Sequence, residues 1–268
     1  MKTHLTATFR NWFIAATLAL SVAATLAAES AALPAREKFH LYLLIGQSNM
    51  AGRGVVEAQD QQPHPRVLTL NKAGRWVPAV DPIHFDKPIA GVGLGTTFGK
   101  IMAERDAAVT IGLIPCAVGG TPIARWQKGA DLYDAALKRA QAAAPHGVFK
   151  GILWHQGEAD SGKEETAKIY ATKLDAMIAA WRADLAQPEL PVVVGQLGEF
   201  FAGGAGLKMV RETLQTLPDR VKHTGFAPAT DLNHKGDKVH FDAAAYREFG
   251  KRYAAAMVKL QAGAAEKK

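Results

Sequence analysis

The feature that most constrains the fold is the alternation of short apolar runs with longer helix-like segments along the chain. Apolar runs that end in glycine are typical of strands buried inside a parallel sheet, and the segments between them provide the crossovers that parallel strands need. The alternation therefore predicts an α/β fold in which one parallel sheet carries helices on both faces. The expected strands cover residues 38–46, 67–70, 107–120, 148–157 and 191–198, and the expected helices cover residues 93–105, 131–144, 163–185, 208–217 and 242–260. We expect the tail over residues 261–268 to fray.

Composition favours one compact domain. Of the 268 residues, 48% are hydrophobic and 21% are charged, which is enough apolar material for a sizeable core. The net charge is +7, but Lys and Arg are scattered along the chain, so we expect a basic surface and no nucleic-acid-binding groove. The one cysteine, Cys116, lies in an apolar run and is expected to be a small buried hydrophobe without an internal disulfide.

Residues 1–30 differ from the rest of the chain. Lys2 and Arg10 precede an apolar stretch rich in Ala and Leu, which ends in small residues that include Ala28 and Ser30. This pattern predicts a signal peptide, with a single uncleaved anchoring helix as the alternative. We therefore expect a periplasmic or secreted protein with no stable membrane insertion after cleavage, and one domain over residues 31–268.

Motifs that would indicate a cofactor do not fit. "GVGLGTTFGK" resembles a phosphate-binding loop, but Leu94 and Ile101 occupy positions where a Walker A motif needs Gly and Ser or Thr. His, Cys and carboxylate residues do not show zinc-protease spacing. "GQSNM" differs from the G-x-S-x-G elbow because Met50 occupies the last glycine position. The sequence therefore predicts neither a nucleotide nor a metal.

Polar or glycine-rich clusters follow three of the expected strands. "GQSNMAG" brings Ser48 after the first, "VGGTPIARW" brings Gly119 and Gly120 after the third, and "WHQGEAD" follows the strand over 148–157. The carboxyl ends of parallel strands form the sheet edge where open α/β folds bind ligands, so we expect these clusters to meet there. Ser48 is a candidate nucleophile, although a serine at this place can also simply cap the next helix.

A further cluster near the C-terminus, "GDKVHFD", places Asp237 three residues before His240. Side chains at this spacing share one face of a helical turn or tight loop, so the carboxylate can hold the imidazole in one tautomer. A serine, an imidazole and a carboxylate are the parts of an acyl-transfer triad. Each cluster alone has an ordinary structural explanation, but their order along the chain favours catalysis.

At these residues the sequence resembles a known family. "GQSNMAG", "GGTPIARW", "WHQGEAD" and "DKVHF" look like successive blocks of the SGNH hydrolase superfamily, in its branch of carbohydrate acetylesterases related to acetylxylan esterases and sialate O-acetylesterases. The resemblance covers roughly residues 38–258. It implies a three-layer α/β/α, flavodoxin-like fold and no cofactor. The loop over residues 54–88 carries no motif of the family.

The resemblance also implies roles for single residues. Ser48 would be the nucleophile, His240 the base that takes its proton, and Asp237 the carboxylate that orients His240. Glu158, in "WHQGEAD", remains open as a second carboxylate for His240, because both loops should meet above the same sheet edge.

The resemblance further implies an oxyanion hole built from three donors. These are the backbone N–H of Ser48, the backbone N–H of Gly120 in preference to Gly119, and the side-chain amide of Gln156. Such preorganised donors are worth about 3 to 4 kcal/mol each in acyl transfer. Candidate substrate-binding residues are Gln47, Asn49, Trp126 and Trp154, with burial in the core as the alternative for the two tryptophans.

These observations predict an exported serine esterase that removes O-acetyl groups from carbohydrate through an acetyl-enzyme. We expect an acetylated xylan-type polysaccharide or oligosaccharide rather than sialic acid as substrate. The alternative from another class is a carbohydrate-binding protein that keeps the fold without catalysis.

Overall fold

The computed structural model describes residues 33–265, which belong to one compact unit. The predicted signal peptide lies outside the described residues. The described chain forms a seven-stranded sheet in the order β3-β2-β4-β1-β5-β6-β7, parallel throughout except for the pair β2 and β3. The strands are β1 (Phe39–Gly46), β2 (Val67–Leu70), β3 (Trp76–Pro78), β4 (Thr110–Pro115), β5 (Val148–His155), β6 (Val192–Gly195) and β7 (Thr224–Ala227).

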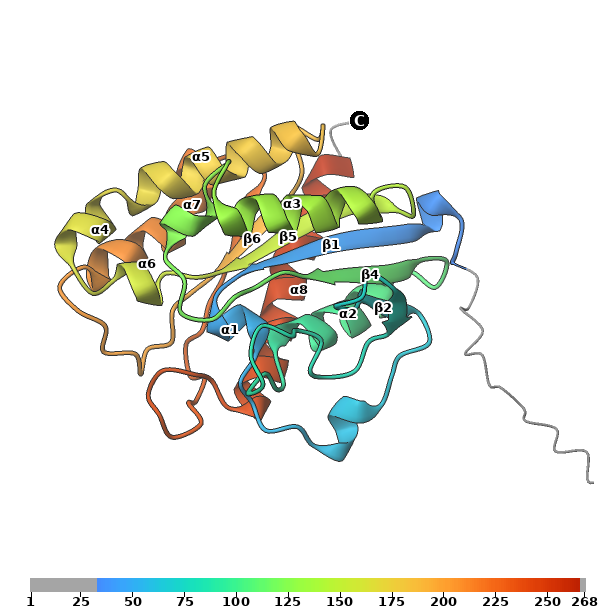
Figure 1. The fold of residues 1–268 in the computed structure, drawn as a ribbon, viewed down its shortest axis with the longest axis horizontal. Helices are drawn as coiled ribbons and strands as arrows, with labels where there is room; N and C mark the ends of the chain where they lie inside the picture. Colours follow the sequence, from blue (N-terminus) through green and yellow to red (C-terminus); the bar gives the residue numbers. More distant parts are fainter. Residues whose placement is uncertain (1–32, 266–268) are drawn as a thin grey trace, which may run out of the picture. The chain divides into compact units, whose positions relative to one another are not determined.

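Helices cover both faces of this sheet (Figure 1). The helices α3 and α5 pack with one apolar cluster and α2 and α8 pack with the other, which makes the predicted three-layer α/β/α arrangement. None of the helices within residues 33–265 is long and apolar enough to cross a membrane. The helices are α1 (Ser48–Ala51), α2 (Leu94–Arg105), α3 (Asp131–Ala143), α4 (Glu164–Lys168), α5 (Tyr170–Asp184), α6 (Leu207–Gln215), α7 (Leu217–Arg220) and α8 (Ala243–Ala265).

The strand β1 shows why the apolar runs form the centre of the sheet. Its odd-numbered residues from Phe39 to Ile45 join the cluster under α3 and α5, while Tyr42 and Leu44 join the cluster under α2 and α8. Successive side chains of a strand point to opposite faces, and here both faces are covered by helices. A continuous apolar run is therefore what this position in the sheet requires.

The boundaries differ from the sequence-based expectation in several places. The expected strand over 107–120 is shorter, because the chain leaves the sheet after Pro115. The expected helix over 163–185 is interrupted at Ile169, and the expected helix over 208–217 ends at Gln215, before a short turn that contains Pro218. A proline lacks the N–H that a continuing helix needs.

Two strands were not predicted, and the end of one helix was placed too early. The sequence analysis missed β3 and β7, which lie at the two edges of the sheet and are only three and four residues long. The helix α8 continues to Ala265, so the expected fraying from residue 261 is wrong up to that point.

The strand order explains where a ligand site can form. β1 lies between β4 and β5, so the chain moves to one side of the sheet after β1 and to the other side after β4. The loops that follow these three strands diverge at their carboxyl ends, which creates the crevice typical of open α/β sheets. Three of the polar clusters identified in the sequence occupy these loops, and the fourth, with Asp237 and His240, follows β7.

Candidate active site

Ser48 lies in a tight turn directly after β1. Gly46 has a φ of +132°, and a Cβ atom there would lie 2.1 Å from the carbonyl oxygen of His155, so the position requires glycine. The N–H of Gln47 donates to the same carbonyl at 2.9 Å. Ser48 is the first residue of α1, so its own N–H has no partner within the helix.

The structure brings the three residues of the predicted triad together. The Nε2 atom of His240 lies 3.0 Å from Ser48 Oγ, and its Nδ1 atom lies 2.7 Å from Asp237 Oδ2. These distances allow the imidazole to accept a proton from the hydroxyl while the carboxylate holds the other ring nitrogen. Residues 192 positions apart in sequence therefore form one hydrogen-bonded chain.

The Asp237 carboxylate also builds the loop that carries His240. Its Oδ1 atom accepts hydrogen bonds from the N–H groups of Val239, at 2.9 Å, and of His240, at 2.8 Å. Partial burial raises the pKa of Asp237, but the hydrogen bonds from His240 and Val239 outweigh it and the pKa is lowered overall. The Nζ atom of Lys235 lies 3.8 Å from Oδ2. The carboxylate is therefore ionised at every pH at which an esterase is assayed.

The two glycines after β4 differ in what their N–H groups contact. The N–H of Gly119 donates to Asp86 Oδ2 at 2.8 Å, and Asp86 forms a buried ion pair with Arg53 at 2.6 Å. Gly120 is exposed and has a φ of +78°. Among the described residues, no acceptor faces the N–H of Gly120. The geometry thus agrees with the preference for Gly120 over Gly119 as a donor to a ligand.

The side-chain amide of Gln156 does not fit the predicted oxyanion role. Gln156 is fully buried, and its Nε2 atom faces three acceptors. An amide group has two hydrogens, so none is left for a ligand. In this arrangement internal acceptors use both hydrogens, so the structure does not support the oxyanion role of Gln156, which stays a prediction. The three acceptors are Gln47 Oε1 at 3.2 Å, the Thr121 carbonyl at 3.1 Å and Asp160 Oδ2 at 2.6 Å.

Gln47 offers the donor that Gln156 lacks. Its Oε1 atom is held by the amide of Gln156 and by the N–H of Ala159. Within residues 33–265, its Nε2 atom has no hydrogen-bond acceptor, and it is not among the side-chain atoms sealed from solvent without a partner. Gln47, predicted from the sequence as a possible substrate-binding residue, directly precedes Ser48.

Glu158 does not contact His240. Its Oε1 atom accepts a hydrogen bond from Asn49 Nδ2 at 2.6 Å and lies 3.6 Å from His155 Nε2. Burial raises the pKa of Glu158, but His155 and Asn49 outweigh that effect and the pKa is lowered overall. The expectation that Glu158 could serve as a second carboxylate for His240 is therefore not met, and Asp237 alone makes that contact.

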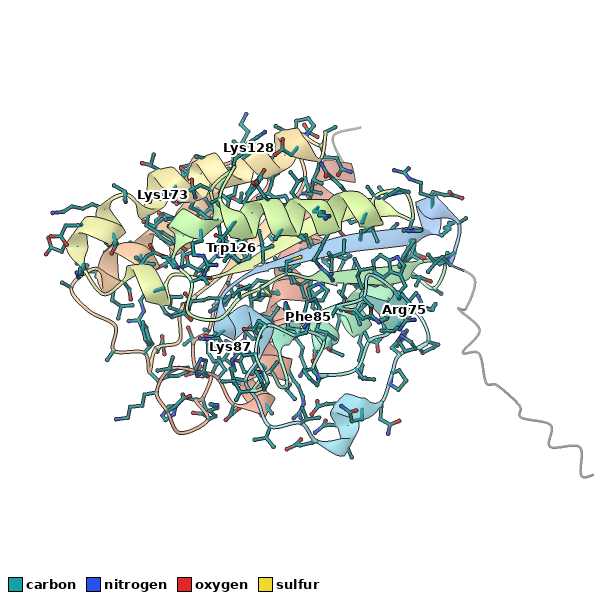
Figure 2. The ribbon with its side chains drawn as sticks, in the orientation of Figure 1. Arg75, Phe85, Lys87, Trp126, Lys128 and Lys173 are labelled. Atoms are coloured by element: carbon teal, nitrogen blue, oxygen red, sulfur yellow. The ribbon has the colours of Figure 1, made fainter. Side chains whose placement is uncertain are left out.

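Three further candidates are parts of the interior. Trp126 and Trp154 are fully buried and pack edge to face, with their ring centres 5.7 Å apart. Trp126, labelled in Figure 2, donates its indole N–H to Thr121 Oγ1. Asn49 is also buried, and internal hydrogen bonds use its amide completely. None of these side chains is available to stack on a sugar or to bind one.

The loop over residues 54–88 contributes residues that sequence reasoning missed. Asp86 accepts a hydrogen bond from the N–H of Gly119, and the guanidinium of Arg139 in α3 lies over the ring of its neighbour Phe85, which is labelled in Figure 2. Phe85, Ile89 and Val55 are exposed apolar side chains of this region. The ion pair between Asp86 and Arg53 joins residues 33 positions apart, so neither short-range spacing nor a motif could have revealed it.

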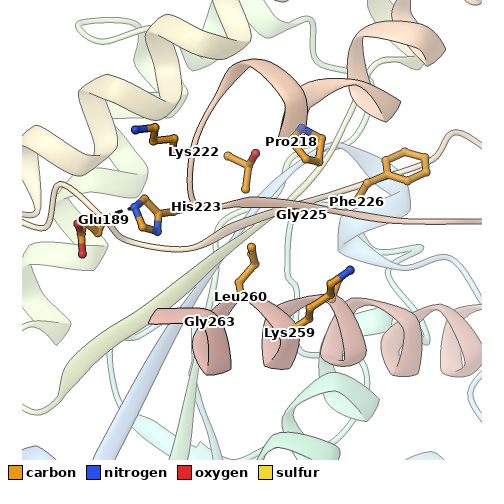
Figure 3. Close-up of a pocket in the computed structure, with 11 residues that line it drawn as sticks. Glu189, Pro218, Lys222, His223, Gly225, Phe226, Lys259, Leu260 and Gly263 are labelled. Carbon is orange, nitrogen blue, oxygen red and sulfur yellow. Dashed lines mark ion pairs between the residues drawn. The ribbon is translucent and has the colours of Figure 1, made fainter. Parts of the chain in front are cut away.

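A large surface pocket lies away from the triad. A surface pocket of about 1070 Å³ is formed at the edge strand β7 and the last turns of α8, with Lys222, His223 and Leu260 in its wall (Figure 3). It contains none of the triad residues. In the described part of the chain, His, Cys, Asp and Glu side chains do not form a group of three or more that could hold a metal ion.

Comparison with known proteins identifies the family. Residues 38–259 match the family model described as carbohydrate esterase, sialic acid-specific acetylesterase. The chain belongs to this family. A probable carbohydrate esterase of Arabidopsis thaliana, At4g34215, is 33% identical over 231 residues, which are 78% of this chain and 86% of the relative. The chain is thus a carboxylic ester hydrolase of the carbohydrate esterase type, as the resemblance implied.

Solved structures of other proteins show the same fold. The structure of At4g34215 has a TM-score of 0.76 at 31% identity and covers 82% of this chain and 98% of its own. NanS has a TM-score of 0.71 at 16% identity, covering 86% of this chain and 100% of its own. A carbohydrate acetylesterase from Xanthomonas citri, XAC1771, has a TM-score of 0.65 at 23% identity, covering 83% of this chain and 57% of its own. The predicted fold class is therefore confirmed.

Proposed function

We propose that this family member removes O-acetyl groups from carbohydrate with Ser48 as nucleophile. The observation that carries the proposal is the hydrogen-bonded chain from Ser48 Oγ through His240 to Asp237. His240 Nε2 takes the hydroxyl proton as Oγ attacks the acetyl carbonyl carbon. Asp237 holds the Nδ1 proton and stabilises the imidazolium that forms.

We propose that the carbonyl oxygen, once negative, is bound by three N–H groups on the other side of Ser48. These are the backbone N–H groups of Ser48 and Gly120 and the side-chain amide of Gln47. The unpaired donors of Gly120 and Gln47 support this choice, as does the brace that Asp86 provides through Gly119. Donors held in place before the reaction stabilise the developing charge at no cost in reorganisation.

The reaction then proceeds through an acetyl-enzyme. Collapse of the tetrahedral intermediate breaks the bond to the sugar oxygen, which takes the proton from His240 Nε2 and leaves as a hydroxyl group. Water attacks the acetyl group on Ser48 while His240 accepts its proton. A second collapse returns the proton to Ser48 Oγ and releases acetate.

For the sugar we propose an acetylated xylan-type polysaccharide or oligosaccharide. The support is that Phe85 and Ile89 are exposed apolar side chains close in sequence to Asp86, which contacts the glycine turn, although Arg139 covers one face of the Phe85 ring. The sialate alternative is supported by the description of the matching family model. Acetate release from acetylated xylan, pectin, sialic acid and simple sugars would distinguish them, and equal release from all would contradict the xylan preference.

We also propose that the protein is exported. The support is the pattern of Lys2 and Arg10 followed by an apolar stretch that ends in small residues. Mass spectrometry of the protein recovered from the periplasm or medium should show a mature chain that begins near residue 31. An intact chain that begins at Met1 in the cytoplasm would contradict export.

The experiment that tests the activity compares the enzyme with Ser48→Ala, using 4-nitrophenyl acetate and then acetylated xylan. We expect the substitution to leave folding intact and to lower kcat by at least about 10⁴-fold. Full activity of Ser48→Ala would overturn the nucleophile assignment. An unaltered protein that binds acetylated sugar without releasing acetate would favour the non-catalytic alternative.

A further inference from the structure

The side chain of Asn49 forms hydrogen bonds with the backbone on both sides of His240. Its Nδ2 atom donates to the carbonyl of Val239 at 3.0 Å, and its Oδ1 atom accepts from the N–H of Phe241 at 3.4 Å. This pairing imitates the exchange of hydrogen bonds between neighbouring strands. Because Asn49 is joined covalently to Ser48, the contact ties the turn of the nucleophile to the loop of the base independently of the bond between Ser48 and His240.

Glu158 fixes the orientation of this amide. An ionised carboxylate can only accept hydrogen bonds, so the Nδ2 side of Asn49 must face Glu158 Oε1, which lies 2.6 Å away. The hydroxyl of Tyr246 donates to Oδ1 from the other side at 2.7 Å. A reversed amide would bring its oxygen against the carboxylate and the Val239 carbonyl. The amide therefore has one stable orientation.

The imidazole of His155 lies beside the Glu158 carboxylate. The Nδ1 atom of His155 contacts the hydroxyl of Tyr253 at 3.1 Å, and that hydroxyl donates its hydrogen to the Trp154 carbonyl at 2.8 Å. Nδ1 must then be the donor to the hydroxyl oxygen, which leaves Nε2 facing Glu158 at 3.6 Å. With a proton on Nε2, the contact is an attractive ion pair inside the protein.

We propose that Asn49 is a positioning residue for His240, held in place by Glu158 and His155. The inference rests on the proposed esterase mechanism and gives none of these residues a contact with the substrate. Without the hydrogen bonds from Asn49 to Val239 and Phe241, the loop that carries His240 is free to move relative to Ser48. A displacement of about 1 Å in a reacting group can cost about 100-fold in rate, so the loss should fall on kcat and leave KM nearly unchanged.

The test is a double-mutant cycle between Asn49→Ala and His240→Ala with 4-nitrophenyl acetate. In the otherwise unaltered enzyme, Asn49→Ala should lower kcat about 100-fold with KM within about threefold. In the His240→Ala background, Asn49→Ala should change the residual rate by less than about threefold, because the group that it positions is gone. Equal losses in both backgrounds, or an unchanged kcat in the first, would overturn the proposal.

A matched control separates positioning from general damage. Asp60 is also a buried carboxylate in an ion pair, at 2.7 Å from Arg247. Asp60→Asn should leave kcat within about threefold, because a partner lost away from the triad alters stability rather than its geometry.

A second variant keeps the proposal testable if Asn49→Ala does not fold. Glu158→Gln retains an oxygen for Asn49 but loses the charge, and should lower kcat about tenfold only when His240 is present. Equal losses with and without His240 would overturn the proposal. Full activity of His240→Ala itself would instead refute the proposed esterase mechanism, so the two failures can be told apart.

Discussion

Asp237 and Glu158 both belong to the network around Ser48, yet they differ in exposure and in partners. The side chain of Asp237 is 36% exposed and bonds to His240, whereas that of Glu158 is 4% exposed and bonds to Asn49. Burial raises the pKa of each, and their partners lower it overall. The carboxylate that contacts the imidazole of His240 is therefore partly exposed, while the one that contacts the amide of Asn49 is buried beside His155.

Of the substitutions at these carboxylates, Asp237→Asn should have the largest effect on activity. The amide can favour the wrong tautomer of His240, so we expect kcat to fall about 10³- to 10⁴-fold with a stable fold and little change in KM. Steady-state kinetics with 4-nitrophenyl acetate, combined with thermal unfolding, measure both effects. A loss smaller than that of Glu158→Gln would reverse the assignment of the two carboxylates.

Asp81 is a buried carboxylate like Glu158, but its pKa is raised and its side-chain hydrogen-bond partner, Thr96, is neutral. Thr96 Oγ1 donates to it at 2.8 Å, and burial raises its pKa to about 7. The native protein then holds this proton until about pH 7, while the unfolded chain releases it near pH 4. The free energy of unfolding should therefore fall as the pH rises through this window, by at most about 4 kcal/mol.

Asp81→Asn should remove this pH dependence. Urea unfolding at about pH 4 and pH 8 gives the difference in stability between variant and parent at each pH. We expect the free energy of unfolding of Asp81→Asn to increase relative to that of the parent as the pH rises. Esterase activity should be unaffected. A difference that is the same at both pH values would show that Asp81 is ionised in the native protein, as Glu158 is.

Glu158→Gln should have a smaller effect, because Gln keeps the shape and one acceptor oxygen for Asn49. We expect kcat to fall about tenfold, as hydrogen bonds to charged groups contribute roughly 1.5 to 3 kcal/mol and only part of this is lost. The double variant with Asp237→Asn tests independence. A joint loss larger than the product of the single losses would mean that the two carboxylates can replace each other.

Much of the fold could be predicted because it depends on local patterns. The apolar run of β1 and the segments of α2 and α3 carry their own periodicity. The edge strands β3 and β7 do not, because they are short and contain Pro78 and Gly225, and they become strands only by pairing with a neighbour.

The site likewise contains residues that local sequence predicts and residues whose contacts depend on tertiary packing. Ser48, Asp237 and His240 could be predicted to lie together because their motifs lie beside strand ends or within three residues of each other, and they do lie within hydrogen-bond distance. The choice between Gln47 and Gln156 could not be made from sequence, since it depends on which amide hydrogens the interior uses. The same holds for Glu158, whose partners Asn49 and His155 are set by packing.

Lys235 offers the smallest and most specific test of the comparison. Its Nζ atom lies 3.8 Å from Asp237 Oδ2, and both side chains are partly exposed, whereas the His155 that faces Glu158 is fully buried. Exposed ion pairs are screened by water and salt and contribute little. Lys235→Met should therefore change kcat/KM for the neutral substrate 4-nitrophenyl acetate by less than about threefold, and the change should shrink at high ionic strength. A large loss that salt does not diminish would mean that Lys235 acts strongly on Asp237 despite its exposure, and that exposure is not what separates the two carboxylates.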